Sequence, residues 1–307
     1  MNEKQLKNIM LMCKDIETKS GKGKIYSLGS KNSNLDIPRW STYIEDLDYI
    51  TGGGLPKGRI IEISGPESSG KTSLALHLTS LHPLALYIPA EGTFDSDRAK
   101  VFGNRKKQLL VYNCDYGEDA LEKTLAFTKQ GIPIIVIDSI PFLCPKEEYD
   151  AVEKDMEKNL RIGGIARLLT KTIPTISKAA EKSGTTIIFI NQVRDKMDAM
   201  MFGEKTQTPG GHAFKHACSI RMQVARRDWI QIPNKDPRSS SDQEKVGIIT
   251  RVKINKSKVC PPFKEAELPM YFDRGYVSHD DMKTIRKELM GIGKKKKSKG
   301  EEEDDDE

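Results

Sequence analysis

The chain has 307 residues, of which 37% are hydrophobic and 31% are charged. This length is enough for one large domain or two modest ones, and it excludes a peptide-sized scaffold. The apolar runs are far shorter than the roughly 20 residues that cross a bilayer, so we expect no membrane partner.

The charge is unevenly distributed along the chain. Fifty Lys and Arg residues stand against 44 Asp and Glu residues, which gives a formal net charge of +6. Residues 301–307 are all acidic, and without them 50 positive charges face 37 negative ones, or +13. A basic body suits a polyanionic partner, which composition leaves open as nucleic acid, acidic protein or anionic lipid.

The cysteines and the N-terminus point to one compartment. The five cysteines lie far apart, with no Cys-x-x-Cys pair and no His at zinc-finger spacing. The N-terminal segment is polar and has no apolar signal region. We therefore expect reduced thiols and a cytoplasmic location. The cysteines are Cys13, Cys114, Cys144, Cys218 and Cys260.

The first predicted element is an amphipathic helix over residues 3–17, which the Gly/Lys segment 20–24 ends. Its apolar residues recur at spacings of three and four. Such a helix is poorly stable alone in water, so it either folds back or docks on another molecule, such as a neighbouring protomer. The apolar residues are Leu6, Ile9, Met10, Cys13 and Ile16.

Short apolar runs alternate with helical patterns over residues 59–191. This alternation predicts an α/β fold with a mostly parallel sheet flanked by helices on both faces. After residue 219 strands follow one another without helices, which predicts an antiparallel extension of the sheet. The predicted strands are 59–63, 85–88, 108–112, 134–137, 185–190, 219–224 and 247–254, and the helices are 72–81, 118–130 and 164–182.

Residues 65–72 match the pattern G-x-x-x-x-G-K-[ST] between a predicted strand and a predicted helix. Glycines let backbone N–H groups approach phosphate oxygens, Lys71 reaches the β- and γ-phosphates, and the Thr72 hydroxyl ligates Mg²⁺. The alternative is an ordinary turn rich in Gly and Ser, which the flanking elements disfavour. The predicted nucleotide-binding residues here are Gly65, Pro66, Glu67, Ser68, Ser69, Gly70, Lys71, Thr72 and Ser73.

Three further polar side chains stand at the ends of predicted strands. Asp138 can hold the water shell of a metal ion beside the loop. Glu91 can orient and deprotonate a water molecule, with a helix cap or a solvated Glu as the alternative. Gln192 can contact a phosphate or this water, or is an ordinary polar strand end. Because the carboxyl ends of parallel strands share one sheet edge, we expect these groups to meet.

A long loop follows Gln192 and ends at Gly210 and Gly211. It contains basic residues, three methionines and one phenylalanine, without the periodicity of a helix or a strand. Apolar wedges between bases, with basic groups on phosphates, would make it a nucleic-acid-binding loop. A mobile lid or a partner-binding loop fits the pattern equally well.

Taken together, these motifs resemble the bacterial-type RecA recombinase family. The resemblance runs over about residues 24–272, and the string GPESSGKT at 65–72 is specific to this family among P-loop proteins. It implies a RecA-like P-loop NTPase core that uses ATP and Mg²⁺. It also implies a helical homo-oligomeric filament on single-stranded DNA, which pairs with homologous double-stranded DNA, and a loader or single-strand-binding protein as a further partner. The other matching segments are 52–59, 90–91, 136–139, 189–194, 201–203, 210–211 and 251–264.

The resemblance also implies roles for individual residues. Glu91 is the water-activating base, Gln192 is the phosphate sensor that links nucleotide to DNA, and Asp138 binds Mg²⁺ through water. Lys256 and Lys258 match lysines that reach the γ-phosphate of the neighbouring protomer as arginine fingers do; without the resemblance they read as a solvated basic strand face. The other implied residues are Asp95 for nucleotide and, for DNA, Ile162, Arg167, Arg194, Met201, Phe202, Gly203, Gly210, Gly211 and Lys215, with DNA-binding loops at about 154–163 and 195–209.

Four residues depart from the family pattern. Arg98 stands where the family has a tyrosine near the adenine, which puts base recognition in question. Pro174 replaces an arginine after the first loop, which removes a phosphate contact and predicts a bend in the helix. His212 and His216 replace an asparagine and a phenylalanine, and they are either structural or a source of pH sensitivity near the protomer interface.

The C-terminal part is short beside the compact C-terminal domain of the family. About twenty residues, 271–290, precede a lysine run at 294–299, and we expect disorder from there on. One interpretation is that these lysines bind DNA phosphates in competition with the acidic residues 301–307. The alternative is that the tail only aids solubility. The predicted organisation is a docking helix and linker at 1–30, an ATPase core at 31–270, a short segment at 271–293 and a disordered tail at 294–307.

The resemblance therefore predicts a DNA-dependent ATPase that catalyses homologous pairing and strand exchange in recombination and repair. One alternative is a nucleotide-gated DNA-coating or mediator protein without strand exchange, which the short C-terminal part and Pro174 allow. A second alternative, a ring-shaped DNA translocase, is disfavoured by the match to the DNA loops and by the lack of an added helicase domain.

Overall fold

A computed structural model describes residues 2–20, 36–92, 94–104, 108–154, 163–195, 206–234 and 241–290. The chain divides into two compact units, Met1–Pro38 and Arg39–Glu307. Two of the predicted domain boundaries, at residues 30 and 293, lie outside the described residues, and the predicted domain division stays a prediction.

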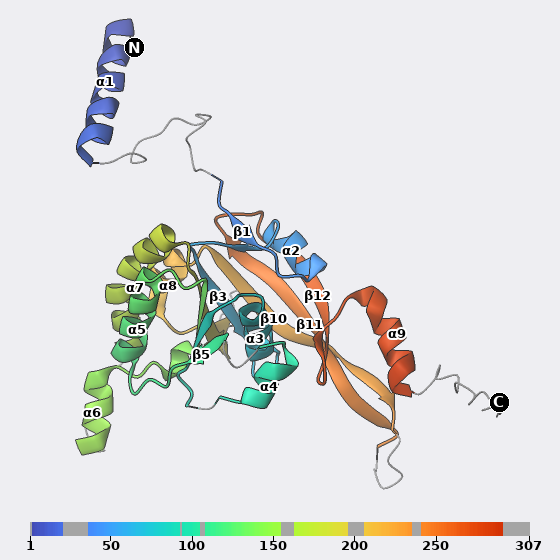
Figure 1. Cartoon of the computed structure of the whole chain (residues 1–307). Coiled ribbons are helices and arrows are strands. Elements are labelled where there is room, and N and C mark those ends of the chain that lie inside the picture. The colour runs from blue at the N-terminus through green and yellow to red at the C-terminus, as the bar shows by residue number, and fades with distance from the viewer. Residues whose placement is uncertain are drawn as a thin grey trace, which may run out of the picture. The chain divides into compact units, whose positions relative to one another are not determined.

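The first unit contains helix α1, Glu3–Ser20 (Figure 1). This helix confirms the predicted amphipathic helix and is three residues longer at its C-terminal end. Leu6, Ile9 and Met10 are 44%, 47% and 61% exposed, so α1 carries an open apolar stripe. Residues 21–24 of the predicted linker lie outside the described residues.

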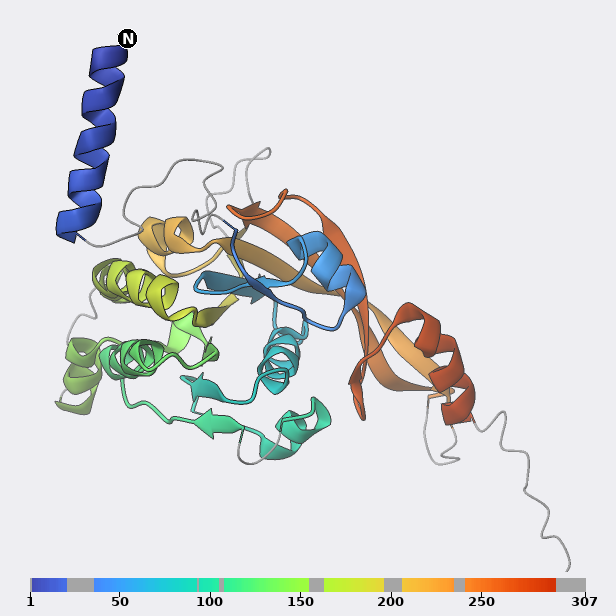
Figure 2. The ribbon, with the colours of Figure 1, turned by 45° about the horizontal axis from the view of Figure 1, so that its top comes forward.

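A nine-stranded sheet is the centre of the second unit (Figures 1 and 2). Its strands are β3 (Ile60–Gly65), β4 (Ala85–Pro89), β5 (Leu109–Val111), β6 (Ile134–Asp138), β7 (Thr186–Gln192), β10 (Ile220–Pro233), β11 (Gln243–Ser257), β12 (Glu265–Tyr271) and β13 (Gly275–Tyr276). Their order is β13-β12-β11-β10-β3-β7-β6-β4-β5. The strands from β10 to β5 in this order are parallel, and those from β10 to β13 are antiparallel. The predicted α/β fold with an antiparallel extension is confirmed.

Helices cover both faces of the parallel part of the sheet, because side chains of a strand point alternately to its two faces. Ile61 and Ile63 of β3 pack in one apolar cluster, and Ile60 packs in the other. The first cluster includes residues of α2 (Glu45–Thr51), α3 (Lys71–Ser80) and α4 (Ser96–Val101), and the second includes residues of α5 (Gly117–Lys129), α7 (Gly164–Ser183) and α8 (Gly211–Ala217). Figure 1 shows α5, α7 and α8 together on one side of the sheet.

Smaller elements complete the second unit. The short strands β1 (Arg39–Trp40) and β2 (Leu55–Pro56) pair with each other, as do β8 (Arg194–Asp195) and β9 (Thr206–Gln207). The remaining elements are the 3₁₀ helix η1 (Ile140–Phe142), α6 (Lys146–Lys154) and α9 (His279–Met290), and α9 lies beside β10 and β12 (Figure 2). None of the helices in the described ranges is long and apolar enough to cross a membrane.

Candidate functional site at the carboxyl edge of the parallel strands

The predicted phosphate-binding loop connects β3 to α3. Gly65 is the last residue of β3, and a Cβ there would lie 2.0 Å from the carbonyl oxygen of Val224 on β10. Only glycine therefore lets the loop begin this close to the neighbouring strand. Gly70 has φ 95° and is the N-cap of α3, so the loop turns directly into the helix.

Lys71, the first residue of α3, is held within this loop. It is 9% exposed, and its Nζ donates a hydrogen bond to the carbonyl oxygen of Pro66 at 2.6 Å. Burial lowers the pKa of Lys71, and the nearby carboxylates of Asp138, Glu91 and Glu67 oppose this shift. A partly desolvated cation with few competing contacts is suited to a phosphate oxygen.

Asp138 ends β6 and contacts two hydroxyl groups. Its Oδ2 accepts hydrogen bonds from Thr72 Oγ1 at 2.8 Å and from Tyr87 Oη at 2.6 Å. Burial raises the pKa of Asp138, while these two hydrogen bonds oppose the shift. Burial also raises the pKa of Tyr87, with the charge of Asp138 adding to the effect.

The Thr72 and Asp138 oxygens fit Mg²⁺, which prefers oxygen ligands and keeps much of its water. Within the described ranges no cluster of three His, Cys, Asp or Glu side chains forms a metal cage. Such a pair of oxygens suits an ion held mainly by phosphates and water. The donor set is therefore consistent with a nucleotide-bound ion.

Glu91 lies next to this pair, two residues after the end of β4. Its Oε1 accepts hydrogen bonds from Ser139 Oγ at 2.9 Å and from Gln192 Nε2 at 3.2 Å. Strands β4, β6 and β7 are neighbours in the sheet, so their carboxyl ends bring these three residues together. The structure thus places Lys71, Thr72, Asp138, Glu91 and Gln192 at one edge of the sheet.

Arg98 lies on α4 and Asp95 is the N-cap of that helix, beside this edge. Asp95 Oδ1 accepts hydrogen bonds from the backbone N–H groups of Asp97 and Arg98, each at 2.9 Å, and so caps α4. Arg98 Nη2 donates to Ser73 Oγ at 3.1 Å, and its guanidinium lies 5.9 Å from the ring centre of Phe272. Arg98, which stands where the family has a tyrosine, therefore contacts α3, the helix that follows the phosphate loop.

The predicted DNA-binding residues are only partly described. Ile162, Met201, Phe202 and Gly203 lie outside the described residues, as does the side chain of Arg194. Pairing of Arg194 with Gln207 joins the two ends of the second predicted loop. Arg167, Gly210, Gly211 and Lys215 are described, and Gly210 has φ 106° and is the N-cap of α8.

A basic hollow of about 700 Å³ adjoins the end of this loop. The cations that line it are Lys215, Arg221, Arg251 and Lys253, together with Gln207 and Thr208 of the loop end. Sequence reasoning did not assign Arg221, Arg251 or Lys253 to the DNA site, although Arg251 and Lys253 lie in a segment that matches the family. Arg251 and Lys253 could have been found from the sequence by their spacing of two, because every second residue of a strand points to the same face. Arg251, Lys253 and Asn255 of β11 share one face in this way.

Lys256 lies on β11, across β10 from the middle of β3, and not beside the phosphate loop. Arg221 pairs in register with both Lys256 and Glu62, and Glu62 precedes Gly65 on β3. Lys256 Nζ donates to the carbonyl oxygens of Lys215 at 2.6 Å and of His216 at 3.1 Å, at the end of α8. Burial lowers the pKa of Lys256, with a smaller contribution from Lys258. Its implied contact with a γ-phosphate would therefore require another copy of the chain.

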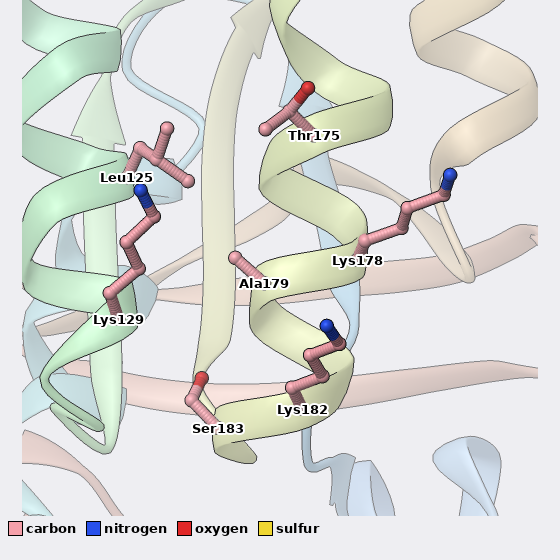
Figure 3. Close-up of a pocket in the computed structure, with 7 residues that line it drawn as sticks. All are labelled: Leu125, Lys129, Thr175, Lys178, Ala179, Lys182 and Ser183. Carbon is pink, nitrogen blue, oxygen red and sulfur yellow. The ribbon is translucent and has the colours of Figure 1, made fainter. Parts of the chain in front are cut away.

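A separate hollow of about 410 Å³ lies between α5 and α7 (Figure 3). These helices end just before β6 and β7 begin, at the sheet edge opposite the phosphate loop. None of the predicted site residues lines it, so it is distinct from the site described above. The lining residues are Leu125, Lys129, Thr175, Lys178, Ala179, Lys182 and Ser183.

A parallel sheet with a phosphate loop after one strand and an Asp at the end of another defines the class of α/β P-loop proteins. Comparison with family models narrows this class. The model described as RecA N-terminal domain matches residues 7–277, and the chain belongs to the RecA family.

Curated relatives agree with this family. The chain is 38% identical over 289 residues to the protein named Protein RecA of Symbiobacterium thermophilum, covering 92% of this chain and 79% of that protein. It is 39% identical over 285 residues to Protein RecA of Syntrophobacter fumaroxidans, covering 91% and 79%. It is 38% identical over 281 residues to Protein RecA of Staphylococcus aureus, covering 90% and 77%. Membership places the chain in a family of DNA recombination and repair proteins that bind ATP and DNA.

Proposed function

We propose that the chain is an ATP-dependent DNA recombinase that forms a filament on single-stranded DNA and exchanges strands with homologous double-stranded DNA. The observation that carries this proposal is the 3.2 Å contact between Gln192 Nε2 and Glu91 Oε1. Glu91 is the carboxylate suited to activate water, and Gln192 is the residue from which the second loop begins. One hydrogen bond thus joins the hydrolytic site to the proposed DNA site.

In the proposed reaction the loop N–H groups and Lys71 bind the phosphates of ATP, and Thr72 and Asp138 hold Mg²⁺, which neutralises phosphate charge. Glu91 accepts a proton from water as the water oxygen bonds to the γ-phosphorus and the bond to the β-phosphate oxygen breaks. Ser139 holds Glu91 in place through its hydroxyl.

The γ-phosphate competes with Glu91 for the amide of Gln192. When Gln192 turns to the phosphate, the start of the second loop moves with it, and Glu91 becomes free to bind water. Lys256 and Lys258 of a neighbouring protomer supply positive charge to the same phosphate in the filament. Hydrolysis and DNA binding are thereby coupled.

The basic hollow beside the loop supports a polyanionic ligand. Lys215, Arg221, Arg251 and Lys253 line it, although Glu265 pairs with Lys253 at 2.8 Å and reduces the net charge. Cations grouped in this way bind phosphates with little sequence preference. Homologous pairing requires such binding, because the bases must remain free to find their partners.

The first test is ATP hydrolysis by the purified protein with and without single-stranded DNA. We expect strong stimulation by DNA, and a loss of about 10²- to 10⁴-fold in Glu91→Ala, as is typical when a general base is removed. Binding of a fluorescent ATP analogue by Glu91→Ala should persist, since Lys71 and the loop are intact.

Hydrolysis that is indifferent to DNA in the wild-type protein would contradict the proposal and favour a mediator that acts on another recombinase. A joint-molecule assay with homologous duplex then distinguishes strand exchange from mere coating of DNA. Electron micrographs that show closed rings instead of filaments would indicate a translocase.

A further inference from the structure

Glu62 is a carboxylate in the middle of β3 whose side chain is fully buried. Its neighbours on the strand, Ile60, Ile61 and Ile63, are apolar and also buried. A buried charge is costly unless it is paired and hydrogen-bonded. The position of its partners therefore indicates what the charge does.

Two side chains satisfy Glu62, and they come from the two strands that flank β3. Arg221 of β10 donates from Nε to Glu62 Oε2. Asn191 of β7, itself fully buried, donates from Nδ2 to Glu62 Oε1 at 2.8 Å. Each carboxylate oxygen thus holds one neighbour.

Both partners also bind the end of the second loop. Asn191 Nδ2 donates to the carbonyl oxygen of Pro209 at 3.0 Å, and Arg221 Nη2 donates to Thr208 Oγ1 at 3.2 Å. Asn191 immediately precedes Gln192, whose backbone N–H donates to Asn191 Oδ1 at 3.0 Å. The start and the end of the loop are therefore fastened to the same carboxylate.

We propose that Glu62 is a positioning residue that, through Asn191 and Arg221, fixes both ends of the second loop and prepares it to bind single-stranded DNA. This inference rests on the proposed DNA-binding function of that loop. Holding the loop ends together in the free protein removes part of the entropy loss on binding. It also joins Thr208 and Pro209 to the strand end that contacts Glu91 through Gln192.

The main test is Glu62→Gln in the full-length protein. Glutamine has nearly the same shape but only one acceptor oxygen, so it cannot serve both Arg221 and Asn191. We expect single-stranded DNA affinity and DNA-stimulated ATP hydrolysis to fall at least tenfold, while ATP affinity without DNA stays within twofold. A purely structural role would weaken ATP binding and DNA binding together.

The matched control is Glu181→Gln, because Glu181 forms another Arg–Glu pair near β3, with Arg59 at 3.0 Å. That pair lies at the opposite edge of the sheet and shares no hydrogen bond with the described loop residues 206–209. We expect it to behave as the wild-type protein in all three measurements.

A second variant tests the inference even if Glu62→Gln does not fold. Thr208→Val removes only the hydroxyl that Arg221 binds and leaves the buried Glu62 paired. Hydrogen exchange of the backbone amides at 206–211 should become at least threefold faster in Thr208→Val, with unchanged thermal unfolding. Because this readout needs no DNA, it is independent of the proposed function.

The outcomes separate the two proposals. If the wild-type protein neither binds nor responds to single-stranded DNA, the proposed function is wrong, while exchange at 206–211 still tests the fastening of the loop. If the wild-type protein responds to DNA and folded Glu62→Gln responds equally, the role of Glu62 is wrong. If Glu62→Gln does not fold, unchanged exchange in Thr208→Val overturns the inference.

Discussion

Single residues at the sheet edge carry buried charges, and their neighbours decide what each can do. Burial raises the pKa of Asp138 and lowers that of Lys71, so desolvation works against both charged forms. Two hydroxyl groups stabilise the Asp138 carboxylate, whereas Lys71 has the Pro66 carbonyl oxygen. A bound phosphate would add the strongest partner that Lys71 can find.

His82 is a buried residue with no such partner. Its ring is 3% exposed and lies edge-on to Trp40 at 4.7 Å, and neither ring nitrogen has a hydrogen-bond partner among the described residues. Burial lowers the pKa of His82 to about 4, and the charge of Lys57 adds to this shift. Protonation must therefore oppose folding at this position.

We expect the free energy of unfolding to fall as the pH drops from about 6.5 towards 4, because the unfolded chain binds the His82 proton more tightly. His82 accounts for at most about 3 kcal/mol of this fall in the free energy of unfolding. His82→Leu should remove it, which urea unfolding at pH 7 and pH 5 would measure. His279→Leu, at a residue 48% exposed, is the control. An identical pH dependence in wild-type and His82→Leu protein would contradict this assignment.

The roles of single residues could be predicted only where a short, continuous stretch of sequence marks them. The phosphate loop is contiguous in sequence, and Asp138, Glu91 and Gln192 follow apolar strands, so each has a short-range signal. The pairing of Glu62 with Arg221 has none, since 159 positions separate them. The burial of His82 against Trp40 has no short-range signal either, because Trp40 lies on a different element, β1.

At the scale of elements, apolar runs located the parallel strands closely. The predicted strand 134–137 is β6, Ile134–Asp138, because a strand covered on both faces is apolar along its length. The strand predicted at 219–224 is part of β10, which continues to Pro233. Residues 226–228 of β10 are exposed and lie at a register shift opposite β11, so no hydrophobic pattern marks them.

Helix α7 continues through Pro174, an exposed residue in its interior. Proline has no N–H group, so the carbonyl oxygen of Thr170 loses its helical partner. We expect Pro174→Ala to raise the free energy of unfolding by about 1–3 kcal/mol, measured in urea. Lys178→Ala changes another exposed α7 side chain without restoring a backbone hydrogen bond, and it should have little effect. Destabilisation by Pro174→Ala would show that the helix is built around the proline.

At the scale of the whole molecule, the exposed apolar stripe of α1 needs a surface that covers it. Leu6, Ile9 and Met10 are 44–61% exposed on an 18-residue helix. An amphipathic helix gains most of its stability from packing of its apolar face. In a filament, the neighbouring protomer is the surface on which we expect this face to dock.

The double variant Leu6→Ser, Ile9→Ser tests this docking. Burial of each side chain contributes about 1.5–3 kcal/mol, so the affinity between protomers should fall at least about 100-fold. We expect sedimentation and electron micrographs with ATP and single-stranded DNA to show short oligomers in place of filaments, with ATP binding retained. Leu11→Ser is the matched control, because a helical period of 3.6 residues puts Leu11 on another face of α1. Filaments of normal length in the double variant would mean that protomers assemble through the ATPase core alone, and shortening by Leu11→Ser as well would point to loss of the helix itself rather than of its apolar face.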